Sequence, residues 1–270
     1  MDNRYIGMFD SGVGGITVLK EVIKALPNEK IMYLGDTKSF PYGNKSKENI
    51  IELTKRGINF LVNQNVKAVI IACGTATSQA LDVVAHLFNV PIIGIIDPTA
   101  YYVANNSDLR KVGVVATSGT INSKAWENSI LKLNPNLTII NKACPLLAPM
   151  AEEGWIDNDV AKLAVKEYMK GLNDVDALIL GCTHYPLFYN LFRAELKPSA
   201  EIINTGTMVA SFLQNTFNSS FFNHSSPSDI KIYLTDTECN FINVAEKLLQ
   251  KRISRIYKCE LPLVFNQNNE

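Results

Sequence analysis

The 270-residue sequence has no excess of charge of either sign and no long hydrophobic run. Basic residues and acidic residues number 26 each, and no basic run interleaved with aromatic residues occurs, so no nucleic-acid partner is expected. A membrane helix needs roughly 20 apolar residues. The longest candidate, residues 90–104, is interrupted by Pro91, Gly94, Asp97 and Pro98. We therefore expect no membrane partner.

The sequence also lacks the patterns of a signal peptide, a disulfide framework and a metal site. Its first residues enter a short apolar segment directly, which predicts a cytoplasmic protein. Structural disulfides are rare in that compartment, and an odd number of cysteines argues against them further. No CxxC or HxxxH pattern occurs, so no metal is expected. The five cysteines are at positions 73, 144, 182, 239 and 259.

The composition, 47% hydrophobic and 19% charged, is that of a folded chain of one large domain or two ordinary ones. Short β-branched runs alternate with amphipathic stretches such as Ile16–Ala25, Lys47–Gln64 and Asp159–Leu172, and a closing amphipathic helix is expected over Asp236–Arg255. This alternation predicts an α/β protein with mostly parallel sheets. We expect strands at Tyr5–Phe9, Lys30–Leu34, Ala68–Ala72, Ile92–Ile95, Lys111–Val115, Leu137–Asn141, Ala177–Leu180, Glu201–Asn204 and Lys231–Leu234.

The pattern occurs twice, which indicates two related α/β halves. The strand around Gly7 resembles the strand around Gly113, and these glycines are 106 residues apart. The run ending in Cys73 resembles the run ending in Cys182, 109 residues later. We expect two pseudo-symmetric, doubly wound domains. The predicted boundaries are 1–97 plus 206–270 for the first domain and 98–205 for the second.

Each half presents one cysteine where a buried strand ends. Ligands of open α/β sheets bind outside the carboxyl ends of the strands. If the halves face each other, Cys73 and Cys182 approach one cleft from opposite sides. Either cysteine alone would be read as a small buried core residue. The matched positions, each followed within two residues by a threonine, favour a functional pair.

Two opposed thiols suit the inversion of a stereocentre, because one group must remove a proton from one face while another delivers a proton to the opposite face. The ordinary pKa of cysteine, about 8.5, makes both thiol and thiolate accessible. Since the α-proton of an amino acid is weakly acidic, the site must also stabilise a developing negative charge beside the carboxylate.

The glycine-rich segment Asp10–Gly15 follows a strand and precedes a helix, where backbone amides can approach an anion. It lacks the third glycine of a dinucleotide fingerprint and the lysine of a P-loop. A tight structural turn explains it equally well. Asp10 and Ser11 fit a substrate ammonium and carboxylate, and Asp10 also fits a helix N-cap.

Three further segments carry candidate side chains. The loop around Tyr42 and Gly43 reads first as a turn and second as a binding loop. His184 can raise the thiolate fraction of Cys182, or can simply be exposed. Glu152 ends a predicted helix, where solvation is the default.

Together, these segments resemble the signature motifs of glutamate racemase, in the aspartate/glutamate racemase superfamily. The matching segments run in the family's order: Phe9–Gly15, Gly35–Thr37 with Pro41–Gly43, Ala72–Cys73, Glu152–Trp155 and Gly181–Pro186.

The resemblance implies a PLP-independent enzyme without cofactor that interconverts L- and D-glutamate and supplies D-glutamate for peptidoglycan. It implies that the active site lies between two domains, that Cys73 and Cys182 are the proton donor and acceptor, and that Asp10, Glu152 and His184 assist them. A homodimer is a family-level expectation. The implied substrate contacts are Asp10, Ser11, Tyr42, Gly43, Gly74, Thr75, Thr183 and His184.

One position departs from the family pattern. The family usually has asparagine immediately after the first catalytic cysteine, and here that residue is Gly74. Loss of one charge-assisted hydrogen bond costs about 1.5–3 kcal/mol if nothing replaces it. Gly74 therefore bears on substrate affinity and preference, while the thiol pair is intact.

The sequence leaves two other functions open. One keeps the fold and mechanism but uses aspartate or a related amino acid as substrate, because the contacts to a distal carboxylate are not evident from spacing. The other is a two-lobed amino-acid-binding protein without catalysis, for which paired thiols would be unnecessary.

Overall fold

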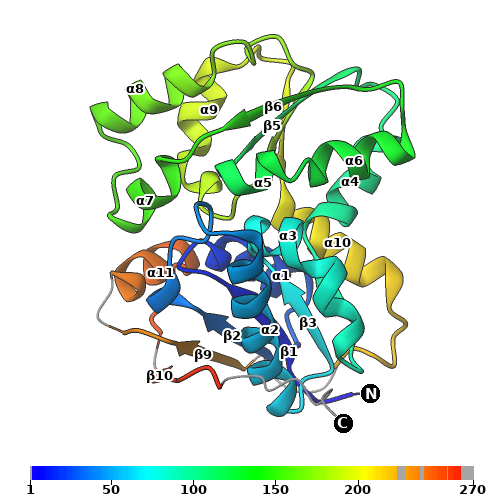
Figure 1. Ribbon diagram of the computed structural model, residues 1–270, viewed down its shortest axis with the longest axis vertical. Coiled ribbons are helices and arrows are strands. Elements are labelled where there is room, and N and C mark those ends of the chain that lie inside the picture. Colours follow the sequence, from blue (N-terminus) through cyan, green and yellow to red (C-terminus); the bar gives the residue numbers. More distant parts are fainter. Residues whose placement is uncertain (1, 224–228, 238–239, 254, 263–270) are drawn as a thin grey trace.

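The structure is a computed structural model that describes residues 2–223, 229–237, 240–253 and 255–262. Two parallel β-sheets lie one above the other along the long axis of the molecule, each flanked by helices (Figure 1). This confirms the predicted α/β class with mostly parallel sheets. We call the part built on the six-stranded sheet the first half and the part built on the four-stranded sheet the second half.

The sheet of the first half has the strand order β10-β9-β2-β1-β3-β4, and all five pairings are parallel. Its strands are β1 (Ile6–Asp10), β2 (Ile31–Gly35), β3 (Ala68–Ile71), β4 (Ile92–Gly94), β9 (Ile230–Leu234) and β10 (Ile256–Lys258).

The sheet of the second half repeats the central part of the first. Its order is β6-β5-β7-β8, all parallel, which matches β2-β1-β3-β4 strand for strand. Its strands are β5 (Lys111–Ala116), β6 (Thr138–Ala143), β7 (Ala177–Leu180) and β8 (Glu201–Asn204). The duplication inferred from the sequence is therefore present in the topology.

The central strands are buried on both faces, as expected for parallel strands between helix layers. In β1, Met8 packs into one apolar cluster and Phe9 into another on the opposite face. In β7, Ile179 and Leu180 alternate in the same way. This arrangement leaves the carboxyl ends of the strands as the places where polar side chains can gather.

Helices flank both sheets and begin at identifiable caps. Ser46 caps α2, Thr117 caps α5 and Asn158 caps α8, each accepting a backbone amide hydrogen bond. The helices are α1 (Gly15–Ala25), α2 (Lys47–Asn63), α3 (Gly74–Val84), α4 (Ile96–Asn105), α5 (Ser118–Asn122), α6 (Ala125–Leu133), α7 (Leu147–Glu152), α8 (Asp159–Tyr168), α9 (Tyr189–Glu195), α10 (Thr205–Thr216) and α11 (Phe241–Leu249). Single 3-10 turns cover Thr37–Ser39, Ala85–Leu87 and Tyr185–Phe188.

Two helices join the halves. The chain crosses to the second half through α4 and returns through α10, and these helices lie together beside α6 at the junction (Figure 1). One apolar cluster continues across this junction, from Val103 on α4 to Ile130 on α6 and Val209 on α10. These crossings lie at the predicted domain boundaries near residues 97 and 205, which we propose as the division between the domains.

The structure differs from the sequence expectations at three places. The helix expected over Asp159–Leu172 ends at Tyr168, and Gly171 in the following turn has a φ of 87°. The closing helix expected over Asp236–Arg255 is shorter, Phe241–Leu249, because Gln250 takes a left-handed conformation; positions 238, 239 and 254 lie outside the described residues. The three-residue edge strand β10 was not expected.

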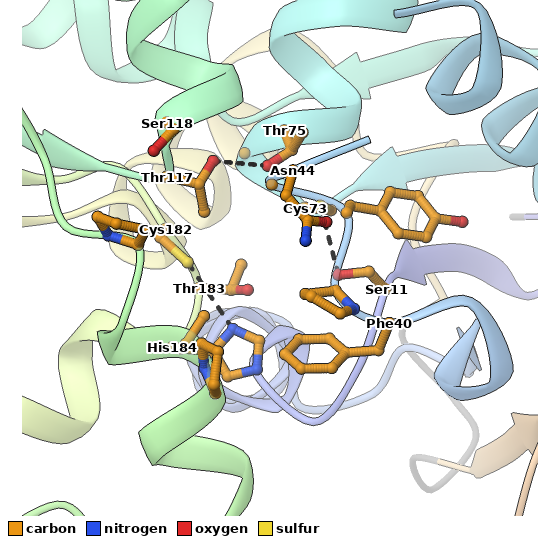
Figure 2. Close-up of a pocket in the computed structure, with 17 residues that line it drawn as sticks. Ser11, Phe40, Asn44, Cys73, Thr75, Thr117, Ser118, Cys182, Thr183 and His184 are labelled. Carbon is orange, nitrogen blue, oxygen red and sulfur yellow. Dashed lines mark hydrogen bonds between the residues drawn. The ribbon is translucent and has the colours of Figure 1, made fainter. Parts of the chain in front are cut away.

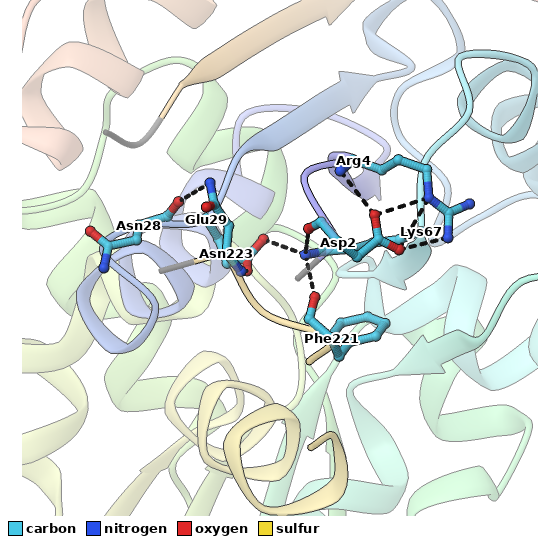
Figure 3. Close-up of polar contacts among 7 residues, drawn as sticks. All are labelled: Asp2, Arg4, Asn28, Glu29, Lys67, Phe221 and Asn223. Carbon is cyan, nitrogen blue, oxygen red and sulfur yellow. Dashed lines mark hydrogen bonds and ion pairs between the residues drawn. The ribbon is translucent and has the colours of Figure 1, made fainter. Parts of the chain in front are cut away.

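A buried ion pair joins the segments that lead into β2 and β3, at the amino ends of these strands (Figure 3). Lys67 Nζ lies 2.8 Å from Glu29 Oε2, and both side chains are almost fully inaccessible. Lys67 also donates to the carbonyl oxygens of Asp2 and Phe221, and the Asn223 amide donates to Glu29. Removing one partner would leave the other charge buried and unpaired, which lowers the free energy of unfolding by about 3–5 kcal/mol.

Among the described residues, no helix is long and apolar enough to span a membrane.

Candidate active site

The two cysteines singled out in the sequence line one cavity of about 110 Å³ between the halves (Figure 2). Cys73 lies two residues beyond β3 and Cys182 two residues beyond β7, which are equivalent strands of the duplicated sheet. Both thiols are nearly buried, with 5% and 6% of the residue exposed. The topology therefore brings together two groups that are 109 residues apart.

Cys73 lies at the start of a helix, and its hydrogen-bond partners are uncharged. It is the N-cap of α3, and its Sγ accepts a hydrogen bond from the Ala76 amide at 3.5 Å. Ser11 Oγ lies 3.6 Å from the same sulfur. Burial, with the charge of Asp10 adding to it, raises the pKa of the Cys73 thiol to about 12 although these hydrogen bonds act in the opposite direction. Cys73 is therefore a protonated thiol at neutral pH.

Cys182 has a cationic neighbour. His184 Nδ1 lies 3.7 Å from Cys182 Sγ, and His184 Nε2 donates to Glu152 Oε1 at 2.6 Å. Burial alone would lower the pKa of His184, but the hydrogen bonds to Cys182 and Glu152 raise it well above its ordinary value. His184 is therefore an imidazolium, and it lies beside the Cys182 sulfur.

Asp10 lies behind the cavity and is not among the residues that line it. Its carboxylate accepts hydrogen bonds from the Gly12 amide at 3.0 Å and from Thr183 Oγ1 at 3.2 Å. Burial raises the pKa of Asp10 to about 6, against the charge of His184 and two backbone hydrogen bonds that lower it. In this conformation Asp10 holds the loops of both halves and does not reach into the cavity.

Glu152 is also absent from the cavity lining, and it bridges the halves. Its Oε1 accepts from His184 in the second half and from the Val13 amide of the first half at 2.8 Å. Phe40 of the first half packs against the His184 ring with a centroid separation of 5.5 Å and belongs to the apolar cluster of the second half. The surroundings of His184 thus depend on contact between the halves.

The other predicted binding residues all line the cavity: Ser11, Tyr42, Gly43, Gly74, Thr75, Thr183 and His184. Thr75 Oγ1 lies 2.9 Å from Thr117 Oγ1, a contact between the halves. Tyr42 is fixed from behind, since its hydroxyl donates to Asp36 at 2.7 Å. Among the described residues that line the cavity none is lysine or arginine, so its polar groups are hydroxyls, backbone amides and the side chains of Asn44 and His184.

At Gly74 the lining has no space for a side chain. A Cβ placed there would lie 2.2 Å from the carbonyl oxygen of Gly181. The asparagine that the family pattern favours at this position cannot fit between the halves as they are placed here. Backbone groups of α3 remain to face the cavity.

The sequence interpretation missed several lining residues: Phe40, Pro41, Asn44, Thr117, Ser118, Pro145, Ala148 and Pro149. Thr117 follows β5 as Ser11 follows β1, at the 106-residue offset of the repeat, so the duplication itself identifies Thr117 and its neighbour Ser118. The prolines and Ala148 carry no chemical signal. Within the described residues no group of three or more His, Cys, Asp and Glu side chains is arranged for a metal ion.

Comparison with known proteins gives a consistent result. Residues 13–213 match the family model described as Asp/Glu/Hydantoin racemase. A glutamate racemase of a Sulfurihydrogenibium species is 42% identical over 247 residues, covering 90% of this chain and 93% of that protein. A glutamate racemase of Geobacter metallireducens is 37% identical over 262 residues, covering 96% and 97%.

A solved structure shows the same similarity. Glutamate racemase from Francisella tularensis, crystallised in complex with D-glutamate, superposes with a TM-score of 0.90 at 36% identity, covering 97% of this chain and 99% of that one. The resemblance found in the sequence is thereby confirmed. The chain belongs to the Asp/Glu/Hydantoin racemase family.

Proposed function

We propose that the protein interconverts L- and D-glutamate without a cofactor, by proton transfer through Cys73 and Cys182. The observation that carries this proposal is that the two thiols come from equivalent strand ends of the two halves and line one cavity. The relatives named glutamate racemase, and the D-glutamate bound to the Francisella tularensis enzyme, support glutamate as the substrate.

The proton transfers balance on the two sulfurs. The thiolate takes the α-proton and becomes a thiol. The electron pair of the broken C–H bond remains on the α-carbon as a carbanion that is delocalised into the carboxylate. The opposite thiol then delivers its proton to the other face of that carbon and becomes a thiolate. The reverse reaction exchanges the two roles.

The different surroundings of the sulfurs set the resting state. Cys73 with its raised pKa is the thiol, so Cys182, which lies beside the His184 imidazolium, is the group that takes the α-proton first. The free enzyme is thus prepared for the enantiomer that turns its α-proton toward Cys182. Binding of the other enantiomer requires the proton to move between the sulfurs first.

The cavity stabilises the developing negative charge with neutral donors in addition to the His184 cation. Gly74 and Thr75 lie in the first turn of α3, where amide groups have no partner within the helix. Ser11, Thr117 and Thr183 add hydroxyl groups around the same space. Donors aimed at a developing oxyanion contribute about 3–4 kcal/mol each when removed singly.

Asp10 and Glu152 act as positioning residues. Glu152 keeps His184 protonated and oriented toward Cys182. Asp10 holds Thr183 through a hydrogen bond, and its charge opposes ionisation of Cys73. Both remain proposals for assisting groups, as the family resemblance implies.

We also propose a cytoplasmic role in supplying D-glutamate for peptidoglycan, with the enzyme acting as a homodimer.

The test is circular dichroism of L-glutamate with the purified protein and no added cofactor. Loss of the signal together with formation of D-glutamate supports the proposal. If aspartate racemises and glutamate does not, the two-thiol mechanism survives and the substrate assignment falls. If the folded protein binds glutamate and changes neither amino acid, catalysis is excluded.

A further inference from the structure

The hydrogen bonds around the cavity reach into the core of the first half through Tyr33. This residue lies in β2, opposite Met8 of β1, and its buried ring packs against Phe241 with a centroid separation of 5.9 Å. Its hydroxyl donates to the carbonyl oxygen of Gly12, a buried residue, at 2.6 Å. Among the described residues no other group donates to this oxygen, so the Gly12 carbonyl has Tyr33 as its hydrogen-bond partner.

The Tyr33 hydroxyl fits closely beneath the glycine-rich segment. Gly15 has no room for a side chain, because a Cβ there would lie 2.5 Å from the Tyr33 hydroxyl oxygen. Burial raises the pKa of Tyr33 well above its ordinary value, and the charges of Asp10 and Glu152 raise it further. The hydroxyl is therefore protonated at neutral pH and available as a donor.

The carbonyl that accepts from Tyr33 and an amide that holds Glu152 belong to one peptide group. A peptide group is planar, so the Gly12 oxygen and the Val13 N–H point in opposite directions and turn together. The Val13 amide donates to Glu152 Oε1 of the other half at 2.8 Å. Tyr33 therefore fixes one side of a rigid unit whose other side contacts Glu152.

The contacts of Glu152 continue this chain of hydrogen bonds to Cys182. Glu152 Oε1 also accepts from His184 Nε2 at 2.6 Å, and His184 Nδ1 lies 3.7 Å from Cys182 Sγ (Figure 2). The charged or titratable groups that face His184 are Glu152, Cys182 and Asp10. The Glu152 side chain is 16% exposed, and the Val13 amide is its described partner in the first half. The placement of Glu152 against His184 thus depends on that amide.

We propose that Tyr33 is a positioning residue for the catalytic pair: its hydroxyl fixes the Gly12–Val13 peptide group, and that group holds Glu152 against His184. This inference rests on the proposed function. Without the hydroxyl the buried carbonyl of the peptide group has no donor, which is costly. The group then rotates toward another donor and its amide turns away from Glu152. The pKa of His184 falls as a result, because Glu152 raises it.

The first experiment observes this peptide group directly in Tyr33→Phe, which keeps the ring and removes the hydroxyl. The sequence contains two Gly–Val bonds, Gly12–Val13 and Gly113–Val114. Protein labelled with carbonyl-¹³C glycine and ¹⁵N valine therefore gives one NMR correlation signal for each bond. The carbonyl carbon and the amide proton of Gly12–Val13 should both move upfield as their hydrogen bonds are lost. Gly113–Val114, inside β5, is the internal reference.

The second experiment follows His184, whose NMR signal is identified by its absence in His184→Gln. His184 should lose its proton at a lower pH in Tyr33→Phe than in the unchanged protein. In the double variant Tyr33→Phe/Glu152→Gln it should titrate as in Glu152→Gln alone, because the carboxylate that Tyr33 positions is already gone. The kcat/KM for racemisation by Tyr33→Phe should fall about three- to tenfold at neutral pH, as for loss of one hydrogen bond.

Tyr102→Phe is the matched control. Its hydroxyl also donates to a glutamate, Glu201, at 2.8 Å, but it lies on α4 outside the cavity. This variant should leave both Gly–Val signals, the titration of His184 and kcat/KM unchanged. If Tyr33→Phe does not fold, protein with 3-fluorotyrosine at position 33 decides. Its more acidic hydroxyl donates more strongly and should move both resonances of Gly12–Val13 downfield.

Either of two results overturns the proposal. One is a Gly12–Val13 signal that stays in place when Tyr33 is changed, and the other is a double variant in which His184 titrates at a lower pH than in Glu152→Gln. The NMR experiments need no turnover. If the unchanged protein does not racemise glutamate, the proposed function fails, and the signals still decide whether Tyr33 holds Glu152. If it racemises and the signals do not move, only the positioning role fails.

Discussion

The two thiols occupy the same place in the duplicated sheet and differ in everything that surrounds them. Cys73 has Ser11 and a helix amide as neighbours, and burial raises its pKa to about 12. Cys182 has His184, which Glu152 holds from the opposite side. The two halves share their strand order, but they place different polar residues next to their cysteines.

This difference teaches how a symmetric frame supports a reaction with two unlike partners. At the 109-residue offset of the cysteines, Thr75 corresponds to His184. The strand order places both sulfurs at one cavity, and only Cys182 has an imidazole beside its sulfur. The repeat sets the positions of the two sulfurs, and the residues next to each sulfur set its electrostatic surroundings.

The largest expected effect is removal of either sulfur. Cys73→Ala and Cys182→Ala should each lower the racemisation rate about 10³-fold or more, because one face of the substrate then has no proton donor or acceptor. The rate is measured by circular dichroism in both directions, with thermal melting to confirm the fold. Cys259→Ala, a cysteine outside the cavity, is the control. Normal turnover in either catalytic variant would contradict the two-thiol mechanism.

A smaller effect is expected from Glu152→Gln, which changes only the Cys182 side. The Glu152 carboxylate raises the pKa of His184, so its loss lowers that pKa, and the imidazolium disappears at a lower pH. The alkaline decline of kcat/KM should move to lower pH, with about a tenfold loss at neutral pH. Glu153→Gln, at the exposed neighbouring position, should leave the profile unchanged. A profile that does not move would contradict the role of Glu152 in raising the pKa of His184.

The smallest effect on turnover, less than about tenfold, is expected from Asp10→Asn, which changes the Cys73 side. The charge of Asp10 raises the pKa of Cys73, so its loss lowers that pKa. Alkylation of Cys73, followed by peptide mass spectrometry against pH, should therefore begin at a lower pH in the variant. Asp82→Asn, at an exposed site on α3, is the control. An unchanged or higher midpoint would refute the electrostatic role.

Asp10 also predicts a change of stability with pH. Its pKa is about 6 in the folded protein and ordinarily 3.8, so protonation favours the folded state. This contribution is fully present below pH 3.8 and is lost as the pH rises through about 6. The stability gained by Asp10→Asn over the unchanged protein should therefore be larger at about pH 7 than at about pH 4. Thermal melting at the two pH values measures the difference, and an equal gain at both would contradict the buried ionisation.

Local patterns were sufficient for the fold. All nine predicted strands are present within two residues of their expected ends, because buried parallel strands are continuous apolar runs. The short edge strand Ile256–Lys258 has no such pattern and was missed. The helix expected to reach Leu172 ends at Tyr168. Met169 and Leu172 continue its apolar pattern and are buried, but they belong to the turn that follows the helix.

The site was predictable where the repeat or a motif marked it, and not where it depends on contact between the halves. Ser11, Cys73 and Cys182 lie at strand ends that the sequence reveals. Nothing local shows that Glu152 accepts from the Val13 amide or that Phe40 packs against His184. These contacts depend on how the two halves are placed relative to each other, which no short stretch of sequence specifies.

The most direct measurement of the central claim is where deuterium appears during the first turnovers in D₂O. With opposed sulfurs, the α-proton is taken by one thiolate and a deuteron is delivered by the other thiol. The account predicts that deuterium enters the product enantiomer, while recovered starting enantiomer keeps its proton. Equal early labelling of both enantiomers would show that one group serves both faces and would contradict the account.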